Sequence, residues 1–141
     1  MQPQPLIAVN NVEASSRWYQ KALGLKSGHG GNEYEMLMHD GRLVLQLHHW
    51  EAHNHPQMGD PKTMPYGNGL LLWFWTDDFD DAVERAVGAG ASVVEGPKEN
   101  VSAQHREIWL RDPGWLCGCP CGTVWRRRHV AFVDFAHCDS S

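Results

Sequence analysis

The chain has 141 residues with a formal net charge of −5, and 42% of its residues are hydrophobic. This length suits one domain that buries about two-thirds of its unfolded surface. The acidic balance argues against a nucleic-acid partner, and no apolar run approaches the roughly 20 residues of a membrane span. Because the first 113 residues lack cysteine and the start lacks signal-peptide features, we expect a cytoplasmic protein.

The first part of the chain predicts a strand, a helix and then further strands. Asn10 or Asn11 is the expected helix cap, Gly24 the expected helix end, and Asp40-Gly41 part of a hairpin turn. The expected elements are a strand over 5–9, a helix over 12–23, a turn or weak strand over 28–32, and strands over 34–38 and 42–50. In the last strand leucines alternate with other residues, so one face is apolar and the other is mixed.

After a polar, proline-rich loop over 51–68, the same order of elements repeats. Asp77 or Asp78 is the expected cap of the second helix. The expected elements are a strand over 69–76, a helix that runs to about Gly88, and strands over 92–95 and 105–110. The sequence therefore predicts a single domain over 1–141, built from two βαβββ units at about 5–50 and 69–120.

The chain changes character after Pro113. All four cysteines and the arginine run 126–128 lie beyond this point. When residues 114–120 are back-translated with suitable codons and moved by one base, they read Asp-Gly-Tyr-Val-Val-Val, which is a turn followed by an apolar strand. We interpret the atypical tail, 114–141, as a frameshifted replacement of the last strand; the alternative is a genuine Cys-x-Cys-x-Cys element. Strand pairing is expected to begin near Trp115 or Leu116, with 130–135 as a candidate cover for the open edge.

Three segments carry a family resemblance. They are V-E-A-S-S-R-W-Y at 12–19, F-W-T-D-D-F-D-D-A-V at 74–83 and L-R-D-P at 110–113. Together they resemble the vicinal-oxygen-chelate superfamily, which contains glyoxalase I, extradiol dioxygenases, fosfomycin-resistance enzymes and bleomycin-resistance proteins. The resemblance implies an α+β fold in which two βαβββ units form a cupped mixed sheet with helices on the outer faces, here with the last strand altered. It also implies a homodimer.

The resemblance places the usual metal ligands of the family on four strands. Aligned by spacing, they fall at Gln4, Gln46, Leu71 and near Cys119. A leucine cannot bind a metal, and Cys119 belongs to the tail. We therefore predict no metal at the usual positions and no cofactor for a binding protein.

Strand alternation predicts which side chains face the cup. The cup-facing tryptophans, expected to bind substrate or ligand, are Trp50, Trp73, Trp75 and Trp109. The cup-facing polar residues are Gln46, His48, His105 and Glu107, with His105 and Glu107 as the candidate catalytic pair. Apolar walls with a few polar groups are typical of a ligand site. The alternative is that the tryptophans fill the cup as core and that His48 and His105 are ordinary core-edge histidines. A second cluster, His48, His49, His53 and His55, is expected to consist of surface histidines, and the alternative for it is a metal-binding loop.

Two functions follow from this pattern. The first is a small-molecule binding protein of the bleomycin-resistance type, whose tryptophan-lined cup stacks a planar or cationic molecule. The second is a glyoxalase-like lyase, or a related dioxygenase or isomerase, that depends on a divalent metal. It would use a relocated ligand set, Gln46, His48, His105 and Glu107, which suits Zn, Ni, Fe or Mn.

Overall fold

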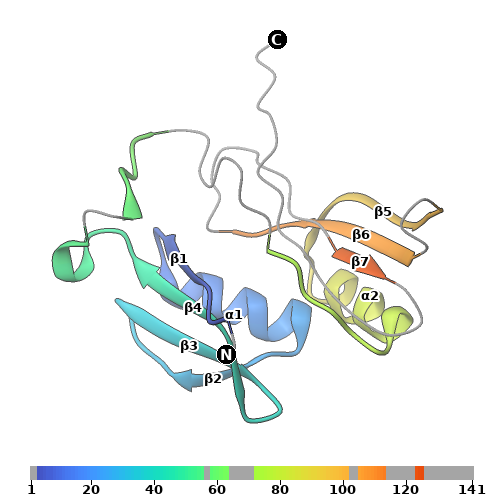
Figure 1. Ribbon diagram of the computed structural model, residues 1–141, viewed down its shortest axis with the longest axis horizontal. Helices are drawn as coiled ribbons and strands as arrows, with labels where there is room; N and C mark the ends of the chain where they lie inside the picture. Colours follow the sequence, from blue (N-terminus) through green and yellow to red (C-terminus); the bar gives the residue numbers. More distant parts are fainter. Residues whose placement is uncertain (1–2, 56–57, 64–71, 102–104, 114–122, 126–141) are drawn as a thin grey trace.

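The computed structural model describes residues 3–55, 58–63, 72–101, 105–113 and 123–125. The expected α+β fold is confirmed, with two sheets that each associate with one helix (Figure 1). The first unit contains β1 (Leu6–Val9), α1 (Val12–Leu23), β2 (Lys26–His29), β3 (Tyr34–His39) and β4 (Arg42–His49), followed by the short 3-10 helix η1 (Ala52–Asn54). The second contains α2 (Phe79–Gly88), β5 (Ser92–Asn100), β6 (His105–Arg111) and β7 (Thr123–Trp125).

The two sheets share one strand order. The first sheet runs β1-β4-β3-β2, with β1 parallel to β4 and the other neighbours antiparallel. The second runs β5-β6-β7, all antiparallel, which matches the β2-β3-β4 part of the first sheet. This agreement is what a repeated βαβββ unit predicts.

Both helices begin and end where local chemistry favours it. The Asn11 side chain accepts a 2.8 Å hydrogen bond from the Ala14 amide, and Gly24 takes the left-handed conformation that ends α1. The Asp78 side chain accepts a 3.2 Å hydrogen bond from the Asp81 amide at the start of α2. Of the helices in the described ranges, none has the length and apolar composition needed to cross a bilayer.

One core holds the two units together. The core-facing leucines of β4, Leu45 and Leu47, are fully buried, and so are Ile108 and Leu110 of β6, which confirms the alternation expected for both strands. The helices α1 and α2 contact each other. The other buried apolar residues of this cluster are Ile7, Val9, Val12, Tyr19, Ala22, Leu25, Leu37, Leu72, Phe79 and Ala86.

A buried carboxylate fastens α1 to its sheet. Glu35 of β3 is 2% exposed, and its oxygens accept hydrogen bonds from the hydroxyls of Ser16 at 2.7 Å and Ser27 at 3.0 Å. The backbone amides of His29 and Met36 donate to the same group. Charge-assisted bonds of this kind offset the cost of burying a carboxylate.

Two strand predictions need correction. The strand expected over 69–76 is not continuous in its described part, since residues 72–76 contain only a single bridge at Phe74. Alternation still holds there, because Leu72 is buried while Trp73 and Trp75 are exposed. Conversely, β5 runs to Asn100 and not to Glu95, because a register shift at the Gly96-Pro97 step lets the strand resume pairing.

The tail contributes a strand at a different place from the expected one. The backbone of β7 pairs with β6, with Val124 opposite Glu107. The pairing predicted near Trp115 or Leu116, and the candidate cover over 130–135, lie outside the described residues. The frameshift hypothesis for the tail therefore stays a prediction.

Candidate functional site

The candidate catalytic pair lies on one face of β6. Alternation along the strand puts His105, Glu107 and Trp109 on the same side. The Nε2 atom of His105 is 3.4 Å from one oxygen of Glu107, and the indole of Trp109 donates a 3.1 Å hydrogen bond to the other. Glu107 is only 3% exposed. The indole of Trp109 therefore gives this buried carboxylate a hydrogen-bond donor, as its burial requires, while Nε2 of His105 lies beside it without a hydrogen bond to it.

A lysine from the neighbouring strand completes this cluster. The ammonium of Lys98 on β5 lies 2.9 Å from Glu107 and 2.6 Å from the exposed Glu95. Hydrogen bonds to Glu95 and then to Glu107 raise the pKa of Lys98 above its usual range. The pairing of Lys98 with Glu107 across the two strands brings this cation in, and the sequence alone did not suggest it.

Two of the predicted tryptophans line one cavity. Trp73 is 41% exposed and Trp75 is 48% exposed, and both border a cavity of about 480 Å³. Its wall also includes Val44 of β4 and carboxylate residues at the start of α2. The ring of Trp73 lies 5.8 Å from that of His105, but the β6 residues that line the cavity are Ile108 and Leu110, on the face of the strand opposite to the Glu107 cluster.

The other two predicted tryptophans do not line this cavity. Trp109 is half-buried and bonds to Glu107, while Trp50 is half-buried and packs against the core. The four tryptophans are thus divided among a cavity wall, a polar cluster and the core margin. The structure therefore brings two of the four to this cavity, and a ligand-binding role for any of them stays a prediction.

The oxygen and the nitrogen of the Gln46 side-chain amide both form hydrogen bonds within the chain. Its oxygen accepts a 2.5 Å hydrogen bond from the hydroxyl of Tyr34, and its nitrogen donates a 3.1 Å bond to the backbone oxygen of Gln4. Leu71 and Cys119 lie outside the described residues. The relocated ligand set also stays a prediction: Gln46 and His48 lie on β4, and His105 and Glu107 on β6.

Three histidines meet at the end of β4. His48 is 4% exposed, and one ligand atom from each of His48, His53 and His55 lies within 4.8 Å of the other two. They border a pocket of about 600 Å³ that also contains His29, Glu33 and Tyr34. The sequence indicated surface histidines, and His53 and His55 are indeed exposed, but His48 is not. Its buried position follows from the alternation of β4 together with the loop that folds back over it.

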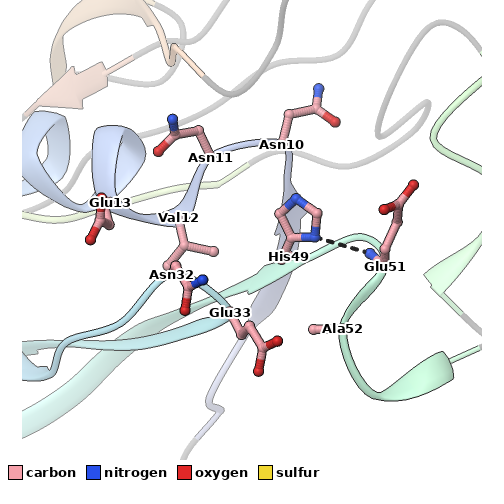
Figure 2. A pocket seen from close by; sticks show the side chains of 9 residues that line it. All are labelled: Asn10, Asn11, Val12, Glu13, Asn32, Glu33, His49, Glu51 and Ala52. Carbon is pink, nitrogen blue, oxygen red and sulfur yellow. Dashed lines mark hydrogen bonds between the residues drawn. The ribbon is translucent and has the colours of Figure 1, made fainter.

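A second, polar pocket of about 490 Å³ lies beside this region (Figure 2). Figure 2 shows His49 accepting a hydrogen bond from the Glu51 amide, at 3.3 Å, with Asn10 and Glu33 around the same space. Sequence reasoning did not single out this pocket, because its residues come from three separate segments with no common motif.

The comparisons with known proteins point to one family. The sequence model of the Glyoxalase/Bleomycin resistance protein/Dioxygenase superfamily matches residues 2–115. Virulence protein STM3117 of Salmonella typhimurium (strain LT2) is 26% identical over 110 residues, which are 77% of this chain and 74% of that protein. Its crystal structure matches with a TM-score of 0.54, covering 81% of this chain and 89% of that one at 20% identity.

Two further solved structures share the fold. The fosfomycin resistance protein FosX of Mesorhizobium loti matches with a TM-score of 0.55 at 11% identity, over 89% of this chain and 92% of its own. A glyoxalase/bleomycin resistance protein/dioxygenase family enzyme of Burkholderia phytofirmans PsJN matches with a TM-score of 0.55 at 18% identity, over 78% and 89%. At such identities the likeness shows the fold alone.

Proposed function

Because the chain belongs to the glyoxalase/bleomycin resistance protein/dioxygenase superfamily, we propose that it binds a small planar or cationic molecule at the cavity bordered by Trp73 and Trp75. The observation that carries this proposal is the exposure of two large aromatic rings on one cavity of about 480 Å³. Exposed tryptophans in a concave site are typical of ligand recognition, since their rings offer a large apolar surface.

The charge around this cavity favours a cation. Asp77, Asp78 and Asp81 all border it, and the cationic Arg85 in its wall is already paired with Asp81. A positively charged ring system would stack on an indole and lie near these carboxylates. A cation over an aromatic face contributes about 0.5–2 kcal/mol, more when water is excluded.

The test compares two ligands of one shape. N-methylacridinium is planar and cationic, and acridine is its neutral counterpart. Isothermal titration should show tighter binding of the cation, and Trp75→Ala should weaken it by about 5- to 30-fold, equivalent to about 1–2 kcal/mol. Trp75→Phe should restore part of the loss.

The controls separate this site from general charge attraction. Asp77→Asn should reduce the preference for the cation, whereas Asp60→Asn removes the same charge at an exposed turn that does not border the cavity and should not. Equal affinity for the two acridines, together with unchanged binding by Trp75→Ala, would contradict the proposal.

A metal-dependent glyoxalase-like lyase is the second candidate. The buried pair of Glu107 and His105 favours it, because a carboxylate beside an imidazole is suited to general acid–base chemistry. A glyoxalase assay with added Zn, Ni, Fe or Mn tests it. Turnover that is lost in Glu107→Gln, with N-methylacridinium binding retained, would support the enzyme over the binding protein.

Members of the superfamily bind small molecules and often form dimers, and we propose a homodimer for this chain as well. The edge strand β1 supports this, since its outer side has no neighbour in the described sheet and Leu6 is 41% exposed. Sedimentation velocity should give twice the chain mass, and a monomer at micromolar concentration would contradict it. A cytoplasmic location likewise stays a prediction from the cysteine distribution.

A further inference from the structure

We propose that His48, His53 and His55 bind one divalent transition-metal ion, at a place separate from the positions where the family resemblance puts metal ligands. The three side chains come from the end of β4, from η1 and from the residue after it. One ring nitrogen of each lies within 4.8 Å of the others. Imidazole groups are preferred ligands of Zn²⁺, Ni²⁺ and Cu²⁺.

The backbone fixes the tautomer of His48. Its Nδ1 lies 2.7 Å from the carbonyl oxygen of His49, so Nδ1 carries the proton and donates it. The lone pair of the ring is then on Nε2, the atom that faces His53. A hydrogen bond from the remote nitrogen to a carbonyl is the usual outer support of a metal-binding histidine.

A carboxylate also lies near His53. The Nε2 atom of His53 is 3.8 Å from Glu33, beyond hydrogen-bond distance, while Nδ1 is the ring atom that faces His48. When a metal takes Nδ1, the proton is on Nε2, and Glu33 is the carboxylate beside it that can accept this proton's hydrogen bond. This Nδ1 is 3.3 Å from Nε2 of His48. Without an ion, a proton on Nδ1 of His53 can bridge the two nitrogens as a hydrogen bond; a metal ion between them would replace this proton and use both lone pairs.

The separation fits a shared metal. With zinc–nitrogen bonds of about 2.0–2.1 Å and a tetrahedral angle, two ligand nitrogens are about 3.3 Å apart. The side chain of His55 lies within 4.8 Å of the other two and must move closer to complete the set; it is exposed, so burial does not hold it in place. Three protein ligands leave a coordination position open, as in zinc sites that carry out chemistry.

A strained turn in the backbone at His53 brings the three histidines together. His53 has a φ of 56°, a left-handed conformation that costs energy for a residue with a side chain. This turn brings His53 and His55 back over His48, with ring centroids 5.4 and 5.0 Å away. The open position would face the pocket of about 600 Å³ that these histidines line with His29 and Tyr34.

Cobalt is the probe that identifies the ligands. The full chain, made without a histidine tag and stripped of metal, is titrated with Co²⁺ and then with Zn²⁺. We expect one equivalent of Co²⁺ with ligand-field bands and no thiolate charge-transfer band, and its displacement by Zn²⁺. A charge-transfer band would show that tail cysteines hold the ion and would overturn the proposal.

Three variants and a control complete the test. His55→Ala and His53→Asn, in which asparagine tolerates the left-handed turn, should each weaken Zn²⁺ binding by more than the roughly 10- to 100-fold typical of losing an outer partner. Glu33→Gln should weaken it about tenfold. His39→Ala removes an exposed histidine elsewhere and should change nothing. Both His53 and His55 are exposed, so circular dichroism should show intact folding. Unchanged affinity in both His55→Ala and His53→Asn, or no Zn²⁺ binding by the parent, would overturn the proposal and leave the three histidines as a hydrogen-bonded cluster.

Discussion

Replacing Glu107 by glutamine tests whether the charge of this buried carboxylate stabilises the fold through its contact with Lys98. The glutamine keeps the shape and an oxygen that can accept from Trp109, so the main loss is the charge-dependent contact with Lys98. Hydrogen bonds to a charged group contribute about 1.5–3 kcal/mol. The Lys98 side chain is 40% exposed and can be solvated by water when the carboxylate is gone. The free energy of unfolding should therefore fall by an amount near the lower end of this range, about 1.5–2 kcal/mol.

The matched control is Glu95→Gln. Glu95 also contacts Lys98, but its side chain is 56% exposed, so its removal should change stability little. Urea unfolding followed by tryptophan fluorescence gives both free energies, and an unchanged m-value would show that the variants unfold from comparable states. If Glu107→Gln is no more destabilising than Glu95→Gln, or if it stabilises the protein, the carboxylate is not held by these contacts.

Three further outcomes follow from the fold. Leu47→Ala should lower the free energy of unfolding by about 2–5 kcal/mol, measured in urea, because Leu47 is fully buried in the core. Gly96→Ala should destabilise more than an exposed control such as Gly88→Ala, since its Cβ would lie only 2.5 Å from the Glu107 carbonyl oxygen at a positive φ. Hydrogen bonds from Arg106 lower the pKa of Asp80 in the folded protein. The ionised Asp80 therefore stabilises the fold at pH values above its ordinary pKa, and this stabilisation is lost as the pH falls through the lowered pKa of the folded state. Asp80→Asn should be destabilising at about pH 7 and neutral in strong acid.

Strand alternation made the cores of β4 and β6 predictable. A period of two fixes that Leu45 and Leu47, or Ile108 and Leu110, share a face, and burial then selects that face for the core. The full extent of β5 was not predictable, because a glycine followed by proline usually ends a strand, whereas here pairing resumes after a register shift.

The site was predictable only where its residues are close in sequence. His105 and Glu107 are two positions apart on one strand, so alternation alone places them together. Lys98 reaches Glu107 through the register of two strands, and His53 reaches His48 through a left-handed turn. Strand register and loop conformation produce no periodic pattern of residues in the sequence. Both are decided by tertiary packing, so these two contacts could not be predicted.

The most direct test of ligand binding at the Trp73–Trp75 cavity is the indole region of a ¹H–¹⁵N NMR spectrum during titration with N-methylacridinium. The chain has seven tryptophans, which single Trp→Phe variants can assign. Binding at this cavity should give saturable shifts of the Trp73 and Trp75 indoles, with little change at Trp18, which lies on α1 outside this cavity. Shifts confined to other tryptophans, or no saturable shift at Trp73 and Trp75, would contradict it.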